Sequence, residues 1–132
     1  MKALVQAIRK IEKRTWVEKV TDDTNPWLSA RNLLREGQYE DAAQCYLKDA
    51  SEQKEKNILR SALSISAAAR CLAQIDKAQE SSQLFLEASK LYKSAIESEN
   101  RDESFLNWIS ERISYCQSRA EYLGNHSFTA SE

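Results

Sequence analysis

Two arginines that stand 39 residues apart are the residues best suited to binding chemistry in this sequence. Arg31 and Arg70 each follow an alanine and are followed two residues later by a leucine. A guanidinium presents a planar set of N–H donors that matches a carboxylate in a two-pronged fashion. Held on adjacent parallel helices, the pair could grip a carboxylate or an acidic peptide. The alternative is that both arginines are solvated, or pair with Glu36, Glu40 or Asp76.

The residues that common catalytic mechanisms need are missing or badly placed. His126 is the one histidine and lies in the predicted tail, which argues against a Ser-His-Asp or Cys-His site. Cys45, Cys71 and Cys116 form no CxxC pair, and the sequence has no P-loop or glycine-rich nucleotide motif. We therefore expect no enzyme activity, no metal site and no cofactor.

The two arginines belong to an internal repeat with a period of 39 residues. The residues that recur unchanged are Ala30, Arg31, Leu33, Gln44 and Leu47, matched by Ala69, Arg70, Leu72, Gln83 and Leu86. Three further pairs keep their approximate size, namely Ala42 with Ser81, Tyr46 with Phe85, and Ala50 with Ser89. A fixed period of about this length is typical of stacked helical hairpins, which bury a continuous core only by packing on one another.

The composition favours helices over strands. The 132 residues include only two glycines and one proline, and helix-forming residues dominate. The hydrophobic spacing predicts an all-α fold of about six antiparallel helices. Their predicted ranges are 2–19, 26–36, 39–54, 58–75, 78–98 and 102–123. The helix over 58–75 is apolar nearly all round, so we place it at the centre of the fold.

These helices are expected to form a single domain. The domain covers 1–124, with helical hairpins over 26–54 and 58–97, and the first and last helices act as polar caps. Gly124 is expected to cap the last helix, because a glycine suits the left-handed position that ends many helices. The tail over 125–132 is expected to be disordered.

The first hairpin resembles the heart of a tetratricopeptide repeat. A small residue, Ala30, is followed three positions later by a large one, Leu33. The family's G-x-Y-x-x-A turn is matched by Gly37, Tyr39 and Ala42, and an aromatic residue follows four positions later. The resemblance implies two helices that pack closely at their small residues.

The second copy keeps this pattern in part. It has Ser81, Phe85 and Ala88, but Asp76 and Ala78 stand where the turn residues should be, so the turn signature is lost. The period of 39 exceeds the usual 34 of the family, which implies longer helices. Long-helix variants occur in the soluble NSF attachment proteins, which the alanine-rich pattern also resembles.

The resemblance implies a non-catalytic interaction module, an adaptor or scaffold, that binds a partner protein or peptide in a concave groove. In that family one face of each hairpin's first helix lines the groove. The partner-binding residues implied in this way are Trp27, Arg31, Arg35, Arg70 and Gln74. The arginines favour an acidic partner.

A second surface offers an alternative function. Trp108, Tyr115 and Tyr122 recur every seven residues, so they form one stripe along the last predicted helix. Such a stripe belongs to the core or, if exposed, marks a contact surface, because aromatic side chains are favoured at interface hot spots. The alternative is therefore a structural subunit or homo-oligomer that assembles through this edge.

Charge and hydropathy limit the other partners. The net charge is −1 and the pI is about 5.9, so nothing draws the chain to nucleic acid. The sequence has no apolar run of about 18 residues, so no stable membrane insertion is expected. The predicted helix over 2–19 has a basic face, but Glu12 and Glu18 dilute it. We expect a soluble, cytoplasmic protein.

Overall fold

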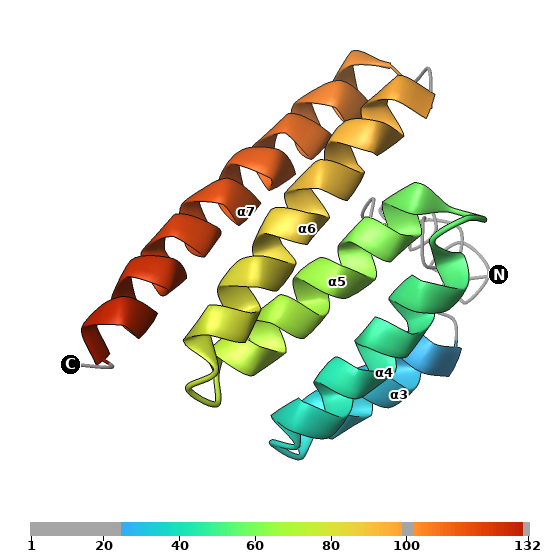
Figure 1. Ribbon diagram of the computed structural model, residues 1–132. Helices are drawn as coiled ribbons and strands as arrows, with labels where there is room; N and C mark the ends of the chain where they lie inside the picture. Colours follow the sequence, from blue (N-terminus) through green and yellow to red (C-terminus); the bar gives the residue numbers. More distant parts are fainter. Residues whose placement is uncertain (1–24, 99–101, 131–132) are drawn as a thin grey trace, which may run out of the picture.

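The described part of the chain is entirely helical. The computed structural model describes residues 25–98 and 102–130, in which there are five α-helices and no strand (Figure 1). The helices are α3 (Asn25–Arg35), α4 (Tyr39–Gln53), α5 (Ile58–Ala73), α6 (Ala78–Ser98) and α7 (Glu103–Ala130). The predicted all-α class is confirmed. The helix predicted over 2–19 lies outside the described residues, so the count of six stays a prediction.

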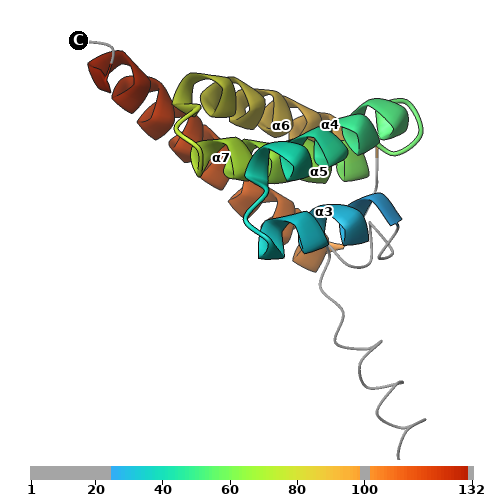
Figure 2. The same cartoon turned by 90° about the horizontal axis from the view of Figure 1, so that it is seen from below.

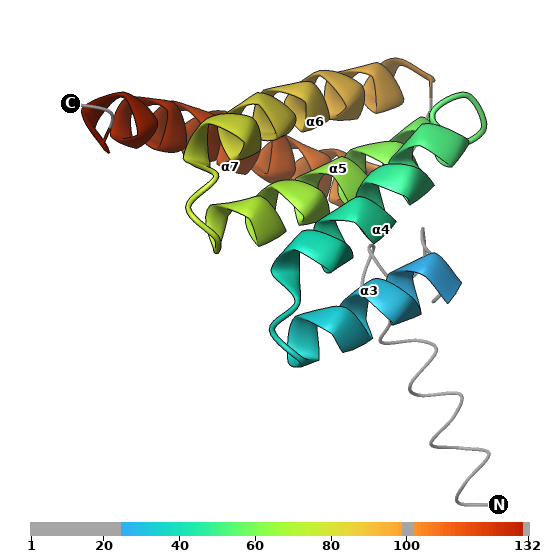
Figure 3. The same ribbon diagram turned by 60° about the horizontal axis from the view of Figure 1, so that its bottom comes forward.

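Each helix makes its main contacts with the helices next to it in sequence, so the chain forms an array with α3 and α7 at its two ends. Figure 1 shows α4, α5, α6 and α7 side by side with alternating directions. In Figure 2, α3 lies on the opposite side of the array from α6. Figure 3 shows the last turns of α7 extending past the beginning of α6.

The central helix α5 is buried on almost every side, as its composition predicts. In the stretch from 61 to 72, every residue is buried except Arg70. Most of these residues are alanine or serine, and small side chains at crossing points let helix axes approach to about 8 Å. Ser61 adds a hydrogen bond to the Ala50 carbonyl on α4, with Oγ and O 2.8 Å apart. Arg70 is therefore the one residue of this stretch that carries its side chain, a charged one, from the core to the surface.

The two repeat copies share the same turn although their turn sequences differ. Gly37 has φ +76° and Asp76, 39 positions later, has φ +60°. The Gln38 N–H donates to a carbonyl of α3 at 2.9 Å, and the Lys77 N–H donates to the equivalent carbonyl of α5 at 3.2 Å. The second copy has therefore lost the residues of the turn signature while keeping the backbone turn. Aspartate tolerates the left-handed conformation better than most residues, which explains how it replaces glycine here.

Helix α7 is longer than predicted. It continues through Gly124 to Ala130, so Gly124 does not cap it and residues 125–130 are helical. Ser82 of α6 donates to the Ala120 carbonyl at 2.6 Å, and a Cβ at Gly124 would lie 3.3 Å from the Ser82 Oγ. The glycine thus permits a close approach of the two helices. No proline follows to end α7.

Candidate functional site

A hollow of about 410 Å³ lies where α3, α4 and α5 meet, and we call it the α3–α5 hollow. Its lining is Leu34, Tyr39, Tyr46, Ala67, Arg70, Cys71 and Gln74. Two tyrosine rings and apolar side chains form most of the wall, while Arg70 and Gln74 contribute polar groups from α5. This mixture of an apolar surface with a few polar groups is typical of binding pockets.

Both repeat arginines influence the hydroxyl of Tyr46. Burial, and after it the Cys71 thiol, raise the pKa of Tyr46, while the Arg70 and Arg31 guanidiniums lower it. Both guanidiniums therefore lie within electrostatic reach of one hydroxyl, although they come from α5 and α3. Glu40, one of the partners that the sequence offered to them, instead pairs with Lys77 at 3.0 Å.

The other residues that the resemblance implies for partner binding lie in different environments: one lines the hollow, two are exposed and one is buried. Gln74 lines the α3–α5 hollow beside Arg70, and Arg31 and Arg35 are exposed on α3. Trp27 is only 5% exposed and packs edge-on against Tyr46, with ring centroids 4.8 Å apart. We therefore leave Trp27 out of the candidate site, because its ring belongs to the core.

The Trp27 indole belongs to a buried polar network that sequence reasoning missed. Its Nε1 donates to Ser64 Oγ at 3.1 Å and to Asp49 Oδ2 at 3.3 Å. Asp49 is 1% exposed and also accepts from Arg60 through Nε at 3.1 Å and Nη2 at 2.5 Å, and from Ser64 at 2.6 Å. The network joins α3, α4 and α5, the three helices that form the α3–α5 hollow, and Trp27 connects it to Tyr46 of the lining.

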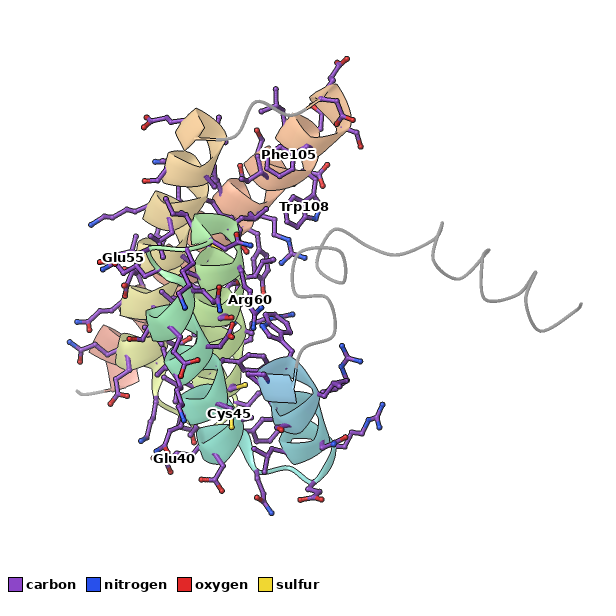
Figure 4. The ribbon with its side chains drawn as sticks, turned by 90° about the vertical axis from the view of Figure 1, so that its right-hand side faces the viewer. Glu40, Cys45, Glu55, Arg60, Phe105 and Trp108 are labelled. Carbon is purple, nitrogen blue, oxygen red and sulfur yellow. The ribbon has the colours of Figure 1, made fainter. Side chains whose placement is uncertain are left out.

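A second hollow of about 450 Å³ lies between α5 and α7, and we call it the α5–α7 hollow. It is lined by Arg70, Trp108, Glu111, Arg112 and Tyr115. The Arg112 guanidinium lies 5.1 Å from the centroid of the Trp108 ring. Figure 4 shows Trp108 projecting from α7 on the side of the array where α3 also lies. Arg70 lines both hollows and therefore joins them.

The aromatic stripe of α7 does not form a separate surface. Trp108 is half-buried, whereas Tyr115 is 44% and Tyr122 is 51% exposed. Tyr115 packs edge-on against Phe85 of α6, with centroids 5.8 Å apart, and it also lines the α5–α7 hollow. The predicted assembly edge and the predicted arginine groove thus share a wall.

Arg112 is the site residue that sequence reasoning missed. It stands four positions after Trp108, and residues with this spacing lie on the same face of a helix, so a signal was available. The pKa of the buried Cys116 thiol shows that the charge of Arg112 acts between α5 and α7. Burial raises the pKa of Cys116, while the Ser66 hydroxyl, then Arg112, then Arg70 lower it. Both arginines of the α5–α7 hollow therefore act on one point between α5 and α7.

Comparison of the chain with protein-family models, with curated proteins and with solved structures gave no match. Within 25–98 and 102–130, no group of three or more His, Cys, Asp and Glu side chains is placed to hold a metal ion. In the same residues, no helix combines the length and the apolar character needed to cross a membrane. What the two hollows bind must therefore be inferred from their shape and charge.

Proposed function

We propose that this protein is a non-catalytic interaction module that binds a partner protein or peptide across the α3–α5 and α5–α7 hollows. The carrying observation is the position of Arg70. It is the one exposed residue in the buried stretch from 61 to 72, and it lines both hollows. An exposed guanidinium that lines both hollows is placed to contact a ligand in either of them.

The chemistry of the hollows favours an acidic segment with apolar side chains. Arg70 and Arg112 line the hollows, and Glu111 is the acidic residue among the hollow linings. Arg31 lines neither hollow, but it is exposed on α3 and its charge acts on Tyr46 of the α3–α5 hollow. Aromatic side chains beside them offer apolar contact. Guanidiniums favour carboxylates because they can form paired, charge-assisted hydrogen bonds with them.

We also propose that the hairpins stack in the manner of tetratricopeptide repeats, as in an adaptor or scaffold of the cytoplasm. Support comes from the 39-residue period and from the matching left-handed turns at Gly37 and Asp76. Ala30 and Ala69, which are equivalent in the two copies, are both fully buried. This is the burial expected of small residues at helix crossings.

Binding to an array of immobilised 12-residue peptides tests the proposal. Each peptide carries two glutamates among Ala, Ser, Leu and Phe, and its partner on the array has glutamine in both places. The full chain is expected to bind a subset of the acidic peptides, and Arg31→Ala/Arg70→Ala is expected to lose this binding. The control, Lys90→Ala/Lys93→Ala, removes two exposed positive charges from α6 and should bind normally. Equal binding by both double variants would overturn the proposal.

A second function, assembly into a homo-oligomer or larger complex through α7, is favoured by the exposure of that helix. As the end of the described array, α7 presents Leu106, Tyr115 and Tyr122, all more than one third exposed. Sedimentation equilibrium at rising protein concentration tests it. Association that Tyr115→Ser/Tyr122→Ser abolishes supports assembly, whereas a monomer at every concentration overturns it.

A further inference from the structure

We propose that the α5–α7 hollow is an anion-binding subsite, in which Arg70 and Arg112 hold a carboxylate or phosphate group of the partner peptide. The inference rests on the proposed function and adds to it the chemical group that the second hollow takes. It also assigns Arg112, which the repeat does not predict, to ligand binding.

The placement of the two guanidiniums is the first argument. Arg70 and Arg112 enter the hollow from different helices, and among the residues that the structure describes neither has an ion-pair partner. The stacking of Arg112 on Trp108 restrains the guanidinium at the wall of the hollow. A restrained donor loses less entropy on binding, which favours a specific contact over a loose one.

The buried hydroxyl of Tyr92 is the second, independent observation. Tyr92 comes from α6, is fully buried, and its ring lies edge-on to Trp108 with centroids 6.5 Å apart. Its Oη is the one buried side-chain polar atom without a hydrogen-bond partner in the described residues. Arg112 and Ser66 lie near enough to lower its pKa, although burial dominates and raises that pKa to about 12. Tyr92 does not itself line the hollow, but its hydroxyl is a donor without an acceptor close to Arg112, on the inner side of the Trp108 ring.

The charge balance of the hollow is the third argument. Glu111 is the single acidic residue in the lining, so the wall carries an excess of one positive charge. Anions are therefore preferred over cations. The apolar faces of Trp108 and Tyr115 add contact area for the side chain that carries the anion or for its neighbour in sequence.

An NMR titration of the ¹⁵N-labelled full chain tests the inference. The probes are three peptides of the form acetyl-Ala-X-Phe-Ala-amide, in which X is glutamate, phosphoserine or glutamine. We expect the Nε–Hε resonances of Arg70 and Arg112 to shift saturably with the glutamate or phosphoserine peptide, and at least tenfold more weakly with glutamine. The tighter of the two charged peptides identifies carboxylate or phosphate as the preferred group. Resonances that respond equally to all three peptides would overturn the inference.

Two variants separate this subsite from the rest of the groove. Arg112→Gln should weaken binding of the charged peptide by about tenfold, the loss expected for a charge-assisted hydrogen bond. Arg119→Gln is the matched control. Arg119 lies two turns after Arg112 on α7 and stacks in the same way, with its guanidinium 5.2 Å from the centroid of the Tyr122 ring, but it lines neither hollow. Arg112→Lys, which keeps the charge, should recover part of the affinity if Arg112→Gln alters the local packing.

The outcomes distinguish failure of the subsite from failure of the proposed function. If Arg112→Gln binds the charged peptide like the unmodified chain while Arg31→Ala/Arg70→Ala does not, the subsite is refuted and the groove stands. If the unmodified chain binds no acidic peptide, both are refuted. Far-UV circular dichroism and thermal melting of each variant confirm that its helices are intact.

Discussion

Removing the Asp49 carboxylate should be among the most damaging single changes to this fold. Asp49 lies on α4 and receives hydrogen bonds from Trp27 of α3 and from Arg60 and Ser64 of α5. The substitution Asp49→Ala removes in one step the acceptor shared by three side chains from α3 and α5. It leaves the Arg60 guanidinium, whose side chain is 13% exposed, beside a methyl group in place of its carboxylate.

The magnitude follows from the burial of this pair. Removing one partner of a buried ion pair typically costs about 3–5 kcal/mol, because the desolvation of the other charge is no longer offset by that partner. Arg60 keeps some contact with water, so we expect a value near the lower end, about 3 kcal/mol. For a domain of this size that lowers the melting temperature by about 10–20 °C. It also removes a large fraction of a total stability of about 5–15 kcal/mol.

Urea unfolding followed by circular dichroism measures this loss. The control is Glu52→Ala, which removes an exposed carboxylate from the same helix and should change the free energy of unfolding by less than about 0.5 kcal/mol. In a double-mutant cycle, Asp49→Ala/Arg60→Ala should cost less than the sum of the two single variants. A loss below about 1 kcal/mol for Asp49→Ala, or simple additivity in the cycle, would refute the reasoning.

Three further predictions concern the turns, the unpartnered hydroxyl and a buried thiol. Gly37→Ala should lower the free energy of unfolding by about 1 kcal/mol and Asp76→Gly should raise it by up to about 1 kcal/mol, because both positions are left-handed. Urea unfolding that shows Gly37→Ala to be stabilising or Asp76→Gly to be destabilising would contradict this. Tyr92→Phe should leave stability unchanged or raise it by up to about 1 kcal/mol, because it deletes a buried hydroxyl without a described partner. A clear loss in urea unfolding would reveal a hydrogen bond that the hydroxyl makes. Burial raises the pKa of Cys71 from 9.0 to about 11, so the folded state holds its proton more tightly than the unfolded chain does. That contribution is complete below pH 9 and is lost as the pH rises towards 11, so Cys71→Ala should flatten the fall in stability that urea titrations measure over this range.

The helices could be predicted closely because their signals are local. Hydrophobic spacing placed the central helix at 58–75, and the structure has Ile58–Ala73. The repeat also predicted that Arg31 and Arg70 share one face; Arg70 lines both hollows and Arg31 lines neither, so the shared groove stays a prediction. Local patterns failed where two signals competed. Gly124 reads as a cap, yet the close approach of Ser82 makes it an interior position of α7.

The network and the second hollow could not be predicted, because they depend on contacts between helices. Asp49 stands among polar residues of α4 and has the pattern of a solvated face, and its burial follows from the packing of α3 and α5 around it. The resemblance to tetratricopeptide repeats implied that Trp27 lines the groove. In the structure its indole N–H instead donates to Asp49 and Ser64 in the core. Arg112 lies outside the 39-residue repeat, and its spacing of four residues from Trp108 shows a shared helix face but not the contact with α5 that makes the hollow.

The position of Tyr115 connects the two proposed functions. Its ring lines the α5–α7 hollow and also a shallow surface formed with Ser110, Ser114 and Ser118 on the outer side of α7. A second copy that packs on this outer surface would therefore contact the rim of the hollow in which we place the anion. Ligand binding and self-association through α7 are then coupled, since each changes the surroundings of the same ring. Because such coupling is reciprocal, an acidic peptide that weakens self-association must itself bind more weakly to the assembled form.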